Sequence, residues 1–406
     1  MKITPRVGVA LFAVPLLLLT ACTADNAPAP TGDGVTLELW IGDRVTQAGM
    51  AATHDVVAEW EKETGNTVEI VENSFFELMN KMSVAIPAGE GPDAFMLTNN
   101  YIGQFAAQNL LAPVTLGEEQ SAAFIDGAVS SFEIDGELYG VPLVADVNAL
   151  VYNKALLKKV PDTFDALVDE ALALTKDGNY GLLFPIDQFW SSFSFLAAEG
   201  GYIFGESDGA VDVDDLGLDN AGSIAGLEYL VDLVNDRGLM PADTTADVAQ
   251  GLFTAGKVAA IIDGPLAIAN FEAAGIEVGV APIPSVAGGF PKPFATYTGL
   301  SMSIETEHAA ETQALLNYLA EHLPGALQGA SDGNISALAG AQTDSEQLQG
   351  WIAQLGHSYA LPSVAEMNLV WGPASAAFTQ AIHGQASAPA ALAEAQQAIR
   401  DAIAAQ

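Results

Sequence analysis

From residue 35 onward, apolar positions recur with the periods of strands and helices. Thr36 to Trp40 alternates polar and apolar residues as a half-buried strand does, and His54 to Glu63 carries apolar residues at helical spacing, with Gly65 after it. Thr67 to Val71 is the next strand by the same criterion. A strand, a helix and a strand at this spacing predict the start of a parallel α/β sheet.

The same periods predict further elements along the chain. Strands are expected at 94–97, 180–184 and 258–262, and helices at 104–111, 166–175, 221–235, 309–323, 347–355, 374–382 and 390–405. Residues 205–219 are acidic and rich in glycine but lack the ordered oxygen spacing of an EF-hand. We expect a solvated loop there.

The stretch from Gly136 to Lys154 contains two apolar runs with Asp146 between them. An uncompensated carboxylate between two buried strands costs several kcal/mol, so Asp146 should lie where the sheet opens onto water or a ligand. We interpret this stretch as a crossing between two lobes, with a binding site between them.

The length and the net charge of the chain limit its domain organisation and the classes of partner that it can bind. The chain has 406 residues, which exceeds one ordinary core and favours two lobes. Its 51 acidic and 13 basic residues give a net charge of -38, which disfavours nucleic acid and anionic lipid headgroups as partners. The acidity fits either the solubility of an exported protein or adaptation to salt, and the sequence leaves both open.

The N-terminus has the pattern of an export signal. Lys2 and Arg6 precede an apolar run, Val7 to Leu19, that is too short to span a bilayer. The following Leu-Thr-Ala before Cys22 resembles the lipobox of bacterial lipoproteins, which implies cleavage before Cys22 and a lipid on its sulfur. The alternative is an ordinary signal peptide. As Cys22 is the sole cysteine, the mature fold contains neither a disulfide nor a cysteine metal site.

Polar residues follow several predicted strands. Asp43 and Arg44 come after the first strand, Asn99 and Asn100 after strand 94–97, and Asp187, Gln188 and Trp190 after strand 180–184. The carboxyl ends of parallel strands are where α/β proteins bind ligands. A solvated surface pair is the alternative interpretation of Asp43 and Arg44, and core packing is the alternative for the aromatic residues near Trp190.

These segments, in this order, resemble the maltose-binding-protein group of ABC-transporter solute-binding proteins. The similarity runs through Trp40 to Arg44, Trp60 to Gly65, Gly89 to Asp93, Tyr139 to Pro142, Val151 to Lys154, Ala197 to Tyr202, Phe253 to Lys257 and Asp263 to Pro265. It implies an α/β, periplasmic-binding-protein-like fold (type II), in which two α/β lobes are joined by a multi-segment hinge and enclose a ligand cleft.

The resemblance also implies a division of the chain and a set of partners. We expect a signal peptide at 1–21, the lipidated cysteine and a flexible tether at 22–34, a first lobe of 35–146 plus 299–346, and a second lobe of 147–298 plus 347–406. The protein would capture an oligosaccharide, with a maltose or maltodextrin-type α-glucoside favoured, and deliver it to an ABC permease. We expect a monomer without a cofactor, lipid-anchored to the outer face of the cell membrane.

By the same resemblance, the sugar would contact residues of both lobes: Asp43, Arg44, Asn99, Asn100, Asp146, Asp187, Gln188, Trp190 and Trp371. Trp190 and Trp371 stand where the family places aromatic rings that stack on sugars. Other positions depart from the family, since Leu266 replaces a tryptophan and Ser375 replaces an arginine. These departures leave a different carbohydrate or a polyol as alternative cargo.

Enzymatic and scaffold functions are the remaining alternatives. Gly329 to Gly333 matches G-x-S-x-G but follows a helical run instead of a strand, so it lacks the setting of a nucleophile elbow. The five histidines show no metal-ligand spacing, and no P-loop is present. Asp43 and Asp146 could serve a glycosidase, but Arg44 beside Asp43 favours a charged carboxylate over a general acid.

Overall fold

We describe a computed structural model of the chain, which covers residues 34–207, 210–331 and 333–405. The expected signal peptide, Cys22 and most of the expected tether lie outside the described residues. Within the described ranges, none of the helices combines the length and the hydropathy of a membrane-spanning segment.

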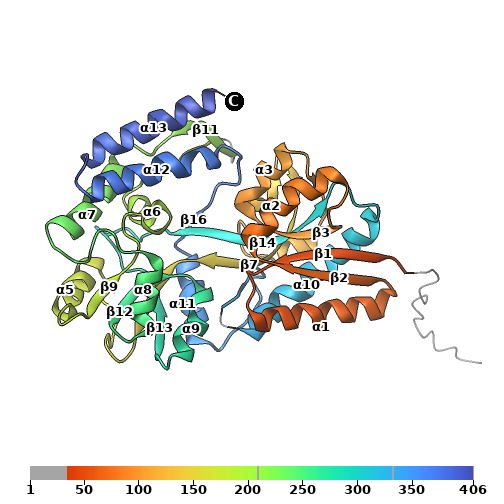
Figure 1. Cartoon of the computed structure of the whole chain (residues 1–406), viewed down its shortest axis with the longest axis horizontal. Helices are drawn as coiled ribbons and strands as arrows, with labels where there is room; N and C mark the ends of the chain where they lie inside the picture. The colour runs from red at the N-terminus through yellow and green to blue at the C-terminus, as the bar shows by residue number, and fades with distance from the viewer. Residues whose placement is uncertain (1–33, 208–209, 332, 406) are drawn as a thin grey trace, which may run out of the picture. The chain divides into compact units, whose positions relative to one another are not determined.

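The first sheet has the strand order β15-β7-β14-β3-β1-β2, with β4 and β16 also paired to β14 (Figure 1). Its strands are β1 (Thr36–Gly42), β2 (Thr67–Asn73), β3 (Ala94–Thr98), β4 (Leu111–Ala112), β7 (Val141–Val147), β14 (Phe294–Ser303), β15 (Ile335–Ser336) and β16 (Tyr359–Ala360). All ten residues of β14 are buried, as expected for a central strand. We call this sheet and the helices packed on it the first lobe.

The predicted strand–helix–strand start is confirmed. β1 is parallel to β2, with Thr36 paired to Thr67, and α1 (Gln47–Thr64) connects them. Thr46 caps the helix by accepting a hydrogen bond from the Gly49 N–H, and Gly65 ends it with a positive φ of 78°. The helix begins seven residues before its predicted start, because its first two turns contain small residues and only one large apolar side chain, Met50.

The second sheet has the strand order β13-β8-β12-β9 and belongs to the second lobe. Its strands are β8 (Ala149–Asn153), β9 (Tyr180–Leu183), β12 (Val258–Asp263) and β13 (Val278–Ala281). β12 is parallel to β9 and antiparallel to β8. Since β7 ends at Val147 and β8 begins at Ala149, Asn148 alone separates the two sheets at this crossing.

Helices pack on both sheets, and short strands and 3-10 turns complete the fold. The further α-helices are α2 (Phe75–Ala85), α3 (Ile102–Ala107), α4 (Glu118–Ala122), α5 (Phe164–Leu174), α6 (Phe189–Ala198), α7 (Ala221–Asn235), α8 (Ala246–Thr254), α9 (Ile268–Ala273), α10 (Ala309–Ala330), α11 (Glu346–Leu355), α12 (Met367–Ile382) and α13 (Ala388–Ala404). The others are β5 (Glu133–Ile134), β6 (Glu137–Leu138), β10 (Phe204–Ser207), β11 (Ala210–Leu216), η1 (Ile86–Ala88), η2 (Asn99–Tyr101), η3 (Ser130–Phe132) and η4 (Pro265–Ala267).

Three local predictions are wrong. The described residues of the acidic stretch are largely strand, because β10 and β11 pair antiparallel. Tyr202, just before β10, donates from its Oη to Asp215 Oδ1 on β11 over 2.9 Å. The helix predicted at 104–111 ends at Ala107, and Leu111 starts β4 on the edge of β14. The helix predicted from Ala374 begins at Met367, so that Trp371 lies inside α12 despite Pro373.

Candidate functional site

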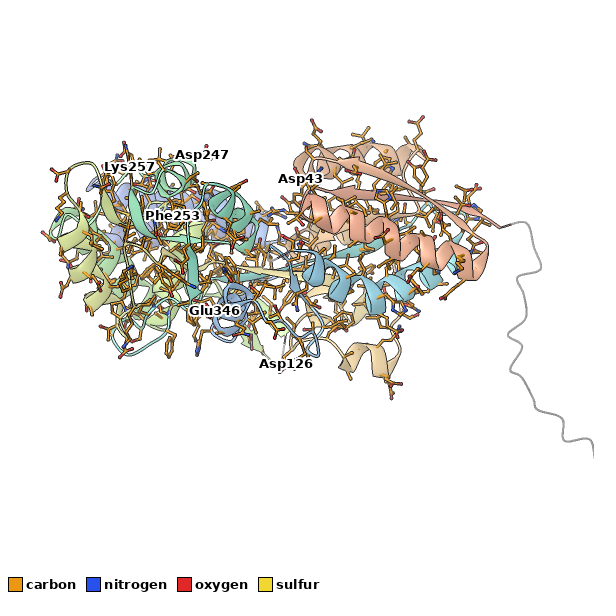
Figure 2. All side chains as sticks on the ribbon, turned by 90° about the horizontal axis from the view of Figure 1, so that it is seen from below. Asp43, Asp126, Asp247, Phe253, Lys257 and Glu346 are labelled. Atoms are coloured by element: carbon orange, nitrogen blue, oxygen red, sulfur yellow. The ribbon has the colours of Figure 1, made fainter. Side chains whose placement is uncertain are left out.

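Asp43 and Arg44 form the loop that follows β1, as predicted. Asp43, labelled in Figure 2, is exposed, and its Oδ1 accepts a hydrogen bond of 2.9 Å from the Phe75 N–H at the start of α2. The Arg44 guanidinium lies over the Phe75 ring, 4.6 Å from its centroid. These contacts hold both side chains of the first lobe in place while leaving them accessible.

Arg44 faces Asp146 across the crossing. The distance from Arg44 Nη1 to Asp146 Oδ2 is 4.0 Å, and the Asp146 side chain is 28% exposed at the end of β7. Burial raises the pKa of Asp146 above its usual value, and the positive charge of Arg44 offsets part of this rise. Arg44 and Asp146 line one cavity together with Leu266 and Asn334.

Asn99 and Asn100 have different environments. Asn99 is fully buried: its Nδ2 donates to Leu361 O and Ser363 Oγ, and its Oδ1 accepts from the Tyr297 N–H over 3.0 Å. Asn100 is half-buried and accepts a hydrogen bond from Thr98 Oγ1. The geometry therefore gives Asn99 a structural role and leaves Asn100 partly accessible.

The three predicted residues after β9 have different surroundings, with Asp187 and Gln188 in the loop and Trp190 in the first turn of α6. Asp187 Oδ2 lies 3.2 Å from His383 Nε2 at the C-terminal end of α12. Trp371 is twelve residues earlier on that helix, which corresponds to roughly 18 Å along its axis. Gln188 is exposed and lines a cavity with Trp190. The structure thus brings Gln188 and Trp190 together in one cavity, whereas Asp187 contacts His383 and does not line that cavity.

The two predicted tryptophans lie side by side. Their ring centroids are 5.9 Å apart, and both rings contact Phe294, the first residue of β14. Trp371 also packs edge-on against Phe189, whereas Trp190 keeps 38% of its surface exposed. Aromatic surface left open beside polar groups is unusual for a packing cluster and suits a ligand with apolar faces.

Asp263 is a candidate site residue that is absent from the residues predicted from the sequence. It ends β12, and it lines the same cavity as Gln188 and Trp190. Gln250 Nε2 and the Gly264 N–H each donate to its carboxyl over 2.8 Å. Burial raises the pKa of Asp263 to about 6, and the nearby charge of Asp146 adds to the rise.

The raised pKa of Asp263 predicts a pH-dependent stability. The charged form is favoured more in the unfolded chain, so ionisation of Asp263 lowers the free energy of unfolding as the pH rises from about 4 to about 6. Asp263→Asn removes this cost, which is at most about 3 kcal/mol. We expect the stability difference between variant and wild type, measured by urea denaturation, to shift in favour of the variant between pH 4 and pH 7. An identical difference at both pH values would contradict the assignment.

In the part of the chain that the structure describes, no group of three or more His, Cys, Asp or Glu side chains is arranged to hold a metal ion. The exposed functional groups of the site are carboxylates, amides, one guanidinium and indole rings. Together they can accept and donate hydrogen bonds to hydroxyl groups and cover an apolar ring face.

Comparisons with known proteins agree with this chemistry. The family model "Bacterial extracellular solute-binding protein" matches residues 55–354. The chain is 28% identical to the "Galactooligosaccharide-binding protein" of Bacillus subtilis (strain 168), over 97% of this chain and 96% of that protein. It is also 28% identical to the "Maltodextrin-binding protein MdxE" of the same organism, over 98% and 97%.

The chain is 29% identical to the "Maltooligosaccharide ABC transporter solute-binding lipoprotein" of Streptococcus pneumoniae (strain ATCC BAA-255 / R6), over 99% of this chain and 97% of that protein. Among solved structures, a cyclo/maltodextrin-binding protein complexed with maltotetraose superposes with a TM-score of 0.84 at 30% identity, covering 93% of this chain and 99% of that one. These matches confirm the predicted two-lobe α/β fold and the family resemblance. The chain belongs to the family of bacterial extracellular solute-binding proteins.

Proposed function

We propose that this protein captures an oligosaccharide, with a maltodextrin-type α-glucoside favoured, and delivers it to an ABC permease without chemical change. The observation that carries the proposal is the exposed indole of Trp190, which lies against Trp371 and lines a cavity together with Gln188 and Asp263. One face of a pyranose is a patch of C–H bonds that an indole can cover, while its hydroxyls need hydrogen-bonding partners.

The proposed ligand residues come from the first lobe, the crossing and the second lobe. Asp43, Arg44 and Asn100 supply hydrogen bonds from the first lobe, and Asp146 does so at the crossing. Gln188, Trp190 and Trp371 complete the contacts from the second lobe. We leave out Asn99, whose amide is bonded to Tyr297 and Leu361, and Asp187, whose Oδ2 lies 3.2 Å from His383 Nε2. Contacts from two lobes favour closure of the cleft around the sugar.

The location of the protein completes the proposal. We infer that Cys22 carries a lipid that anchors a monomer to the outer face of the cell membrane, where a sugar would be captured before transport. What supports this is the lipobox-like sequence and the lipoprotein description of the Streptococcus relative. Mass spectrometry of the protein from its membrane would find a diacylglycerol on Cys22, and an unmodified or absent Cys22 would contradict the anchor.

A galactooligosaccharide is the second candidate cargo. The galactooligosaccharide-binding relative matches as well as the maltodextrin-binding one, at 28% identity each. Leu266 lines the cavity of Arg44 and Asp146 at a position where the resemblance implies a tryptophan, so one expected stacking surface is missing.

A thermal-shift screen tests the proposal. The purified protein would be heated with maltose, maltotriose, maltotetraose, galactooligosaccharides, other oligosaccharides and polyols. A ligand at about a hundred times its Kd adds roughly 2.7 kcal/mol to the free energy of unfolding, which raises the melting temperature measurably. A rise with α-glucosides supports the favoured cargo, a rise with another sugar alone reassigns it, and no rise with any carbohydrate refutes the proposal.

A further inference from the structure

The edge of the second sheet brings Asp263 to the predicted ligand residues. β9 and β12 are parallel, with Leu183 paired to Ile261. Their carboxyl ends therefore meet at one edge, where open α/β sheets bind ligands. The loop after β9 ends at Gln188, Trp190 follows in the first turn of α6, and β12 ends in Asp263.

The cavity at this edge is lined by polar side chains, most of which make no hydrogen bond within the described part of the protein. Asp263, Asn148, Gln188 and Trp190 line it, and the floor includes Ile261 and Ile262. Among the hydrogen bonds of the described residues, none involves the side-chain amides of Asn148 and Gln188 or the indole N–H of Trp190. Convergent free donors and acceptors beside an open aromatic ring are typical of a ligand site.

Gly264 keeps the crossing close to this cavity. A Cβ at this position would lie 3.0 Å from Asp146 Oδ1 and 3.5 Å from Asn148 Oδ1. The absence of a side chain therefore lets Asp146 and Asn148, which come from the passage between the sheets, pack against the turn that follows Asp263. Residues of the crossing and of the second sheet meet at one point.

The Asp263 carboxyl is fixed but has acceptor capacity left. Gln250 on α8, the helix that also carries Asp247 and Phe253 in Figure 2, donates to Oδ2, and the Gly264 N–H donates to Oδ1. Each carboxylate oxygen can accept two hydrogen bonds, so one position on each remains. No Lys, Arg or His forms an ion pair with Asp263 among the described residues, and its neighbouring charge is that of Asp146.

We propose that the Asp263 carboxyl, with the side-chain amides of Asn148 and Gln188, binds the hydroxyl groups of the pyranose unit that stacks on Trp190. This inference rests on the proposed function and adds Asp263 and Asn148 to the ligand residues. A carboxylate that is already oriented by two protein donors needs little reordering on binding, so it selects a sugar with a hydroxyl at that position over one without it.

Calorimetric titration with maltotetraose tests the inference on wild type, Asp263→Asn, Asp263→Ala and Asp93→Asn. Asp93 is the matched control, because the Glu38 N–H and Thr306 Oγ1 both donate to its carboxyl, and because it lies at the amino end of β3, whereas Asp263 lies at the carboxyl end of β12. We expect about tenfold weaker binding or more for Asp263→Asn and at least as large a loss for Asp263→Ala. Asp93→Asn should stay within about threefold of wild type, since it contacts no ligand in this account.

The outcomes separate this inference from the proposed function. Suppose that wild type binds maltotetraose and that both Asp263 variants have native circular dichroism. If their Kd values then stay within about threefold of the wild-type Kd, the inference about Asp263 is overturned and the proposed function is not. If wild type binds another sugar of the screen instead, that sugar replaces maltotetraose in the titration. A wild-type protein that binds no carbohydrate refutes the proposed function and this inference with it.

Discussion

Replacing Trp371 with alanine is expected to weaken maltotetraose binding by roughly tenfold to a thousandfold. The indole lies beside Trp190 at a centroid distance of 5.9 Å, and in the proposed complex it covers one face of a sugar ring. Its removal loses the buried apolar contact and exposes that face to water, at a cost of about 1.4 to 4 kcal/mol. Calorimetric titration of wild type and variant measures the ratio of the two Kd values.

Two further variants make the Trp371 result specific. Phe290→Ala removes an exposed ring that stacks on His357 and lines none of the site cavities described above, so its Kd should match that of wild type. Trp190→Ala should weaken binding like Trp371→Ala, and the double variant should lose less than both effects added, because the rings touch. Unchanged affinity in Trp371→Ala would remove this residue from the site.

Asn99→Ala is expected to lower the free energy of unfolding by about 2 to 5 kcal/mol. The buried amide joins the end of β3 to β14 and to residues 361–363, and alanine leaves the Tyr297 N–H and the Leu361 carbonyl without these partners. Urea denaturation followed by circular dichroism measures the loss.

Asn100→Ala is the matched comparison for Asn99. Asn100 is half-buried, and its side chain contacts Thr98, so its replacement should cost less than about 1 kcal/mol of stability while weakening sugar binding. The opposite pattern, with Asn99→Ala stable but unable to bind sugar, would restore Asn99 as a ligand residue and remove its structural role.

The fold was predictable where local signals agreed with tertiary packing. The alternation in β1 and the position of Gly65 define a strand and a helix end that the structure reproduces. α12 was truncated in the prediction because Gly372 and Pro373 interrupt the local pattern. In the structure, burial of Val370, Ala374 and Phe378 outweighs the hydrogen bond that Pro373 cannot make.

The site was predictable only at the level of strand ends. From the sequence, Asp187 and Gln188 were equally good candidates for ligand residues. Their different surroundings depend on the start of α6 and on His383, which is 196 residues after Asp187 in the chain. Asp263 was missed because Asp-Gly-Pro is an ordinary turn signal, and its place beside Gln188 follows from the register of β12 against β9. The lobe boundaries stay a prediction, although β14 pairs with the first sheet from its start near Phe294.

Calorimetric titration of the wild-type protein with maltotetraose, followed by chromatography of the recovered sugar, tests the central claim most directly. We predict one site with a Kd on the order of micromolar, as a few charged hydrogen bonds and stacking can supply, and intact maltotetraose at the end. Cleavage of the sugar would contradict capture without chemistry. If the folded protein binds neither maltotetraose nor any other carbohydrate of the screen, the proposal that it captures a sugar is contradicted.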